Sequence, residues 1–154
     1  MRSRHRPWSV TAVCLALALF AASGCRTAPL VDPPPTAAGP TLEQTRIAVL
    51  RALATKRFVV DEESPGRIRA RLQKNSWSLV VEVLYGKDVS IHYADSVNLR
   101  YQVENDVAYI HRNYNVFVGE LQEEIQRQLI VEARGDAARS GAQPAPLPAA
   151  PPTH

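Results

Sequence analysis

Hydrophobic and polar residues recur with two different periods along the chain, and nearly all of this periodicity lies between residues 41 and 134. From residue 42 to about residue 56 the apolar positions are three to four apart, which predicts an amphipathic helix. Thr41 before it and Gln44 three residues later have the spacing of a capping box. The same period returns from about Asn113 and predicts a long last helix. Its apolar positions are Tyr114, Phe117, Val118, Leu121, Ile125 and Leu129.

Between these two helices apolar and polar residues alternate, and a period of two predicts strands. A short strand is predicted in residues 57–62, a second in 66–73, a third in 76–85 and a fourth from about 89 to 93. The sequences SPG, KN and GKD between them are turn signals. In each strand one face is more apolar than the other, which is typical of an antiparallel meander covered on one side.

The predicted order of elements is α-β-β-β-β-α, a two-layer α+β domain in which both helices pack on one face of the antiparallel meander. We place this domain at residues 41–134. Residues 25–40 contain three consecutive prolines and no hydrophobic period. They are predicted to form an extended tether that reaches up to roughly 45 Å, at about 3.1 Å per residue. Residues 135–154 are rich in alanine and proline and are predicted to be a disordered tail.

The first 24 residues have the composition of a secretory signal peptide. Three arginines give a positively charged start, and an apolar run of thirteen residues without charge follows from residue 10 to residue 22. This run is too short to span a hydrocarbon core of about 30 Å as a helix, which takes about 20 residues. Three small residues then precede Cys25: Ala22, Ser23 and Gly24.

The junction at Cys25 resembles the lipobox of bacterial lipoproteins, although Ala22 stands where leucine is commonest in that family. The resemblance implies cleavage by signal peptidase II between Gly24 and Cys25. It also implies a diacylglycerol on the thiol and a further acyl chain, such as palmitate, on the new amino terminus. It implies an outer-membrane location facing the periplasm, because Arg26 differs from the aspartate that marks inner-membrane retention. An ordinary signal peptide, cut nearby to leave Cys25 as a free thiol, is the alternative.

Charge and cysteine content both change when the signal is removed. The whole chain has 18 lysines and arginines against 15 acidic residues, a formal charge of +3. Arg2, Arg4 and Arg6 account for the excess, so a chain starting at Cys25 is neutral and gives no basis for a nucleic-acid partner. Cys14, the only other cysteine, lies within the apolar run. Cys25 would then have no partner for an internal disulfide.

The polar and aromatic residues between positions 91 and 115 are the one stretch with side chains suited to chemistry. On a continuous strand His92 and Asp95 point to opposite faces, whereas His92 and Ser96 share a face but are about 13 Å apart. No metal-ligand spacing, glycine-rich loop or nucleophile elbow is present. We therefore expect no catalytic residues, metal or cofactor. A small periplasmic hydrolase that uses His111 with Asp95 or Ser96 is the alternative function.

Five residues are candidates for binding. A row of arginines on the polar face of the second strand would suit phosphate headgroups, anionic sugars or an acidic protein. The alternative is a solvated face balanced by Glu82 across the hairpin. His111 and Asn113 could contribute to a binding site or hold a loop and cap the last helix. The candidates are Arg67, Arg69, Arg71, His111 and Asn113.

Three sequence motifs extend the resemblance into the folded domain. GRIRA at 66–70, IHYADSVNLRY at 91–101 and IHRNYN at 110–115 are similar to a group of small proteobacterial lipoproteins of unassigned function. Phe117 stands where those proteins often have tryptophan. The resemblance supports secretion, lipidation and the α+β domain, and it implies no activity. We expect a membrane-anchored module for binding or envelope maintenance, or alternatively an accessory subunit that docks on an envelope protein.

Overall fold

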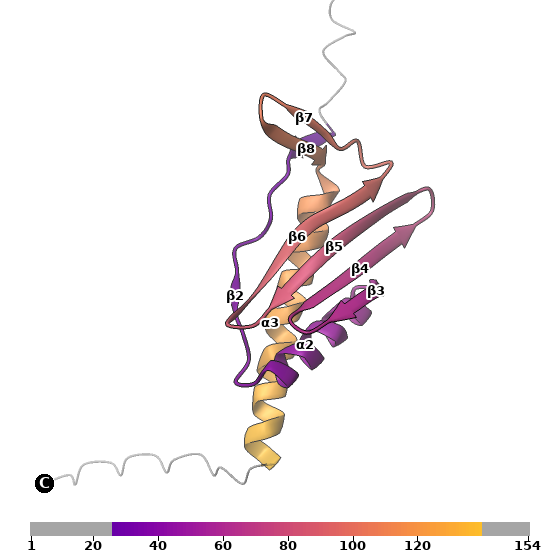
Figure 1. Ribbon diagram of the computed structural model, residues 1–154. Coiled ribbons are helices and arrows are strands. Elements are labelled where there is room, and N and C mark those ends of the chain that lie inside the picture. Colours follow the sequence, from indigo (N-terminus) through magenta and orange to yellow (C-terminus); the bar gives the residue numbers. More distant parts are fainter. Residues whose placement is uncertain (1–25, 140–154) are drawn as a thin grey trace, which may run out of the picture.

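The computed structural model describes residues 26–139. The predicted signal peptide, the cleavage site at Gly24 and Cys25, and the tail beyond residue 139 lie outside these residues. The described chain has two layers, one of antiparallel strands and one of two helices (Figure 1), which confirms the α+β class. The helices are α2 (Leu42–Thr55) and α3 (Asn113–Arg139), and the strands of the main sheet are β2 (Thr36–Ala37), β3 (Val59–Ser64), β4 (Arg67–Lys74), β5 (Trp77–Tyr85) and β6 (Asp88–Val97).

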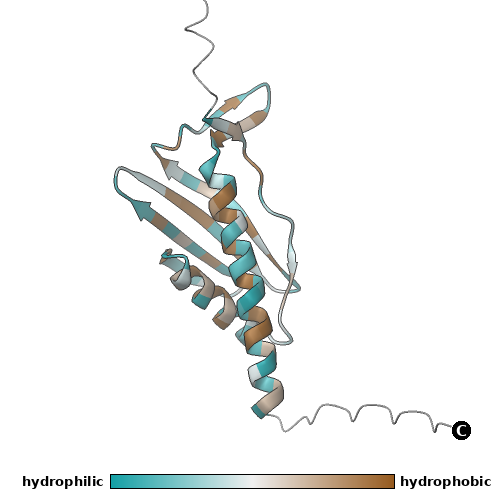
Figure 2. Cartoon of the chain, turned by 180° about the vertical axis from the view of Figure 1, so that it is seen from behind, coloured by the Kyte–Doolittle hydropathy of each residue, from teal (hydrophilic) through white to brown (hydrophobic). Residues whose placement is uncertain are grey.

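The main sheet has the order β2-β6-β5-β4-β3, so the four strands from β3 to β6 form the predicted antiparallel meander. Both helices lie on the same face of it, as the view from behind shows (Figure 2). Ile68, Val83 and Ile91 are neighbours across three strands, and all three are buried beneath the helices. Burial of each such side chain contributes about 1.5–3 kcal/mol. The predicted apolar faces of these strands are therefore the core.

Helix α2 begins as the sequence predicts. The Thr41 hydroxyl accepts a hydrogen bond from the Gln44 backbone N–H at 3.1 Å, and the Gln44 side chain accepts one from the Thr41 backbone N–H at 3.1 Å. Both groups would otherwise be unpaired at the helix start. The Thr45 hydroxyl also accepts a bond from the Gly39 N–H, which joins the preceding segment to the first turn.

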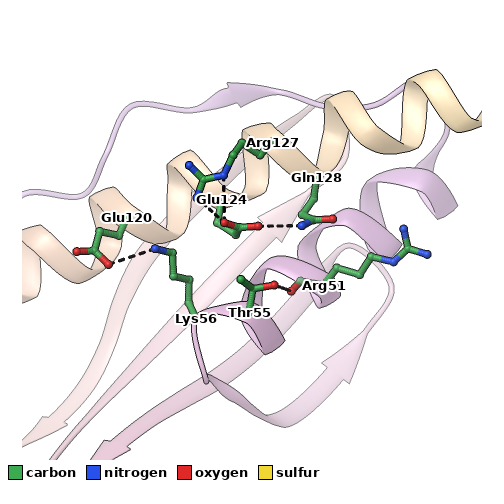
Figure 3. A network of polar contacts seen from close by, with 7 residues as sticks. All are labelled: Arg51, Thr55, Lys56, Glu120, Glu124, Arg127 and Gln128. Carbon is green, nitrogen blue, oxygen red and sulfur yellow. Dashed lines mark hydrogen bonds and ion pairs between the residues drawn. The ribbon is translucent and has the colours of Figure 1, made fainter.

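Helix α3 packs along α2, and polar side chains cross between them (Figure 3). Lys56 at the end of α2 pairs with Glu120 at 3.2 Å. Glu124 is buried, and Arg127 and Gln128 of the same helix donate hydrogen bonds to it. These donors hold the pKa of Glu124 below its usual value, so the carboxylate stays charged in the interface.

A second sheet, which the sequence did not predict, is formed by three short strands in the order β1-β8-β7. The sequence pattern predicts no regular element for residues 102–111, but they form a hairpin whose turn is made by Asn105 and Asp106, both at positive φ. This backbone conformation is the one that a tight two-residue hairpin turn requires. The three strands are β1 (Thr27–Pro29), β7 (Gln102–Glu104) and β8 (Val107–His111).

The prediction of a free tether before residue 41 is wrong for the described part of that segment. We call residues 26–39 the N-terminal segment. Its strand β1 pairs with β8, and its strand β2 pairs with the start of β6. The segment is extended, as its prolines predict, but it lies against the folded domain. The folded domain therefore includes residues 26–40, before its predicted start at residue 41, and α3 continues through Arg139 beyond the predicted domain end at residue 134.

We expect Thr41→Ala to lower the free energy of unfolding by about 1 kcal/mol, because it leaves a helix-start N–H without its acceptor. Thr55→Ala is the matched control, since its hydroxyl donates to the Arg51 carbonyl at the other end of α2. Urea denaturation of both variants measures the difference. Equal losses in the two variants would contradict a special role for the cap.

Candidate functional site

Asp32 connects the N-terminal segment to both layers of the domain. One carboxylate oxygen accepts a hydrogen bond from the Tyr93 backbone N–H of β6 at 3.2 Å and one from the Tyr114 hydroxyl of α3 at 2.7 Å. The other oxygen lies 3.1 Å from Nδ1 of His92. Because β2 pairs only with the first residues of β6, the carboxylate takes the place of a strand partner further along that edge.

Three tyrosines pack beside this carboxylate. Tyr114 is completely buried, and the ring of Tyr93 lies edge-on to it with centroids 5.7 Å apart. The ring of Tyr101 stacks on the ring of Tyr93 with centroids 4.8 Å apart. Burial raises the pKa of Tyr114, and the hydrogen bond to Asp32 raises it further, so the phenol remains a donor. Burial also raises the pKa of Tyr93.

His92 lies between Asp32 and Ser90, with Nε2 3.0 Å from the Ser90 hydroxyl. The order of contacts is the one found in serine hydrolases, where an aspartate orients a histidine that contacts a serine. Catalysis of that kind also needs hydrogen-bond donors for an oxyanion and a pocket that binds the substrate. Ser90 and His92 are on the outer face of β6, and neither lines any of the three cavities described below. Their contacts therefore support a structural role for Asp32.

The residues of the alternative hydrolase, His111, Asp95 and Ser96, are arranged differently from the sequence expectation. The register of β5 and β6 shifts at Ala94, where an extra residue forms a bulge. The bulge puts Asp95 on the same face as His92 and turns Ser96 to the inner face, which reverses the expected assignment. The Ser96 hydroxyl contacts the Tyr93 hydroxyl at 2.9 Å, and Asp95 accepts a bond from the Ser96 N–H. No hydrogen bond joins His111 to Asp95 or Ser96 within the described chain.

His111 and Asn113 lie at the start of α3, as the sequence suggested. Nδ1 of His111 accepts a hydrogen bond from the Asn113 backbone N–H at 3.3 Å, so the histidine contacts the first turn. Asn115 has a role that the sequence did not reveal. Its side chain donates to the Pro29 carbonyl at 2.9 Å and accepts from the Val31 N–H at 3.2 Å. It therefore holds the N-terminal segment against α3.

The arginine row on β4 is largely neutralised by neighbouring carboxylates. Arg67 contacts Glu82 at 2.6 Å, which confirms the expected balance across the hairpin, and Arg71 contacts Asp61 at 3.0 Å. Arg69 lies between Glu62 on one neighbouring strand and Glu82 on the other in the sheet register. The row is therefore a poor candidate for an anion-binding site.

Two neighbouring cavities at one end of the domain contain basic side chains. One has a volume of about 270 Å³ and includes His111 and Asn113, the two remaining candidates. The other has a volume of about 230 Å³. Trp77 lines both, and its ring stacks on Phe117 with centroids 5.3 Å apart. The cations around the two cavities are Arg26 and Arg100 in the larger and Lys56, Arg57 and Lys74 in the smaller.

The largest described cavity, of about 540 Å³, has a different character. It lies between the start of α2 and the β3–β4 turn, where Arg46 pairs with both Glu43 and Glu63. Its charged lining groups are thus already paired with one another. The two cavities that meet at Trp77 are the better candidates for binding an anion, and we call this part of the surface the basic end.

Metal binding and membrane crossing can be considered for residues 26–139. Within them no group of three or more histidine, cysteine, aspartate or glutamate side chains is arranged to hold a metal ion. No helix in that range combines the length and the apolar character that crossing a bilayer takes. Comparison of the chain with known protein families, curated proteins and solved structures found no match in any of the three.

Stability at high pH tests the contact between Tyr114 and Asp32. Unfolded tyrosines ionise near pH 10, whereas buried Tyr114 stays protonated, so its contribution to stability is complete below that pH and is lost as the pH rises further. We expect Tyr114→Phe to cost about 1–2 kcal/mol at pH 7. Above pH 10 the unfolding free energy of the variant should decrease less steeply with pH than that of the parent protein, by about 1.4 kcal/mol per pH unit.

Urea denaturation at pH 7, 10, 10.5 and 11 measures both effects. Tyr101→Phe is the matched control, because that ring belongs to the same cluster but is exposed, and it should leave the slope of the parent protein unchanged. A Tyr114→Phe variant with the parental slope would show that the hydroxyl does not carry the pH dependence.

A fluorophosphonate probe tests the contacts of Ser90. Because Ser90 lines none of the three described cavities, we expect the probe not to label the folded protein covalently. Mass spectrometry after incubation measures the label. Labelling that disappears in both Ser90→Ala and His92→Ala, and persists in Ser96→Ala, would instead establish a hydrolase.

Proposed function

We propose that this protein is a lipoprotein of the bacterial cell envelope, anchored in the outer membrane through acylated Cys25 and facing the periplasm. The signal-like sequence, the lipobox-like junction and the lone cysteine of the processed chain support this proposal. Two or three acyl chains, at about 0.8 kcal/mol per buried methylene, make such anchoring effectively permanent. The folded domain then acts as a binding module at the membrane surface.

The observation that carries the placement of the module at the membrane surface is the position of Arg26, the residue after Cys25. Its carbonyl accepts a hydrogen bond from the Arg112 N–H at 2.9 Å, and Thr27 pairs with His111 in the sheet. An acyl group on Cys25 would therefore be a single residue away from the folded domain. The module would lie against the bilayer rather than at the end of a long tether.

Two of the sequence motifs that resemble small lipoproteins contain residues with a place in the same arrangement. His92 and Tyr93 of the second motif contact Asp32, and Tyr114 and Asn115 of the third motif contact Asp32, Pro29 and Val31. These residues hold the N-terminal segment on the domain. These contacts fit a requirement to keep the domain close to its anchor.

We expect Cys25→Ser to abolish incorporation of radiolabelled palmitate and to release the protein from membranes, because the thiol that carries the lipid is gone. Cys14→Ser is the matched control, since it removes the only other cysteine of the chain. Fractionation on a sucrose density gradient, followed by mass spectrometry of the purified protein, measures location and acylation together. A Cys25→Ser variant that is processed normally and stays in the membrane fraction would disprove the lipid anchor.

A further inference from the structure

We propose that the basic end binds the phosphate of anionic membrane lipids, through arginine and lysine side chains around Trp77. This inference rests on the proposed lipid anchor, because the anchor is what would bring the basic end to the bilayer. It goes beyond the anchor in assigning a binding site and a ligand class to the domain itself.

The first argument is charge. Among the described residues lining the two cavities there are five arginines and lysines, and Glu120 is the one carboxylate. Glu120 already pairs with Lys56. Elsewhere on the domain Arg46, Arg67 and Arg71 pair with carboxylates. A cluster of cations without matching carboxylates attracts phosphate, which accepts several charge-assisted hydrogen bonds at once.

The second argument is the backbone at two of these cations. Six described residues other than glycine have positive φ, and four of them are asparagine or aspartate, which tolerate that conformation. The other two are Arg57 at φ 63° and Arg100 at φ 55°, and each lines one of the two cavities. Arginine at positive φ costs conformational free energy. The local fold does not require an arginine at either position, and we therefore assign the two guanidinium groups to ligand binding.

The third argument is position and shape. Arg26 lines the larger cavity and directly follows the anchor residue, so this cavity opens where the domain would meet the headgroups. Trp77 forms a wall common to both cavities, and an indole is well suited to the boundary between headgroups and acyl chains. The start of α3 lies at the same end of the molecule, beside β7 and β8 (Figure 1).

The fluorescence emission of Trp77 can report binding at the basic end. The chain contains two tryptophans, and replacing Trp8 by phenylalanine leaves Trp77 as the only indole whether or not the signal is cleaved. We would purify the full chain carrying Trp8→Phe in neutral detergent and titrate it with dihexanoyl phosphatidylglycerol. Dihexanoyl phosphatidylcholine and inorganic phosphate form the two comparison arms. Saturable change of Trp77 emission with phosphatidylglycerol alone is the expected result.

The test variant is Arg57→Asn with Arg100→Asn, which removes one cation from each cavity and places a residue tolerant of positive φ at both positions. It should fold at least as stably as the parent and bind phosphatidylglycerol roughly 30-fold more weakly. The matched control is Arg69→Gln with Arg134→Gln, which removes the same charge away from both cavities. Its affinity should equal that of the parent.

Four outcomes would overturn the proposal: no response to phosphatidylglycerol, an equal response to phosphatidylcholine, an equal loss in the control variant, or full occupancy by inorganic phosphate. The last would identify a site for soluble phosphate instead. The mass of the purified protein separates this test from that of the anchor. An unacylated protein that gives the expected titration would refute the lipid anchor but support the headgroup site. An acylated protein that does not respond to phosphatidylglycerol would support the anchor but refute the headgroup site.

Discussion

The carboxylate of Asp32 joins parts of the chain that are far apart in sequence, and the position of the N-terminal segment depends on it. It accepts hydrogen bonds from the β6 backbone and from the buried hydroxyl of Tyr114, and it contacts the ring of His92. A buried phenol without an acceptor would cost about 1–3 kcal/mol, so the segment and α3 stabilise one another. The placement of Arg26 at the basic end follows from the same contacts, because β1 and Asn115 continue the attachment toward that residue.

If the protein is anchored through Cys25 as we propose, this attachment determines which surface of the domain would face the membrane. A proline-rich tether would let the domain sample a wide volume, and no particular surface would face the bilayer. A segment paired with β8 and β6 instead fixes which end is nearest to residue 26. That end has cations without matching carboxylates and a stacked tryptophan, whereas the cavity at the start of α2 has its charges paired internally. The end of the domain nearest to residue 26 is therefore also the end with the cations suited to anionic headgroups.

Most of the central fold could be predicted from the sequence because its signals are local and repeated. The capping box at Thr41, the period of α3 and the alternation in β4 and β5 are all present as expected. The N-terminal segment could not be predicted, because the backbone N–H of Tyr93 and the hydroxyl of Tyr114, both more than sixty residues away along the chain, hold Asp32 in place. The bulge at Ala94 has no sequence signature and reversed the faces of Asp95 and Ser96. The Asn-Asp pair at 105–106, two residue types that tolerate positive φ, is the one local sequence signal for the second hairpin. Of the candidate binding residues, His111 and Asn113 do line a cavity, but its cations, Arg26 and Arg100, carry no sequence pattern that would single them out.

The pairing of β1 with β8 also has a kinetic consequence. The first described strand and the last are separated by about the length of the domain, so a full set of native contacts requires nearly the whole chain to be present. Loops of this length close slowly, and native structure that depends on them cannot form on a partly emerged chain. A polypeptide that crosses a membrane through a narrow channel must stay unfolded until it has passed. For an exported protein, a topology that leaves its final helix to secure its first strand delays folding until translocation is complete.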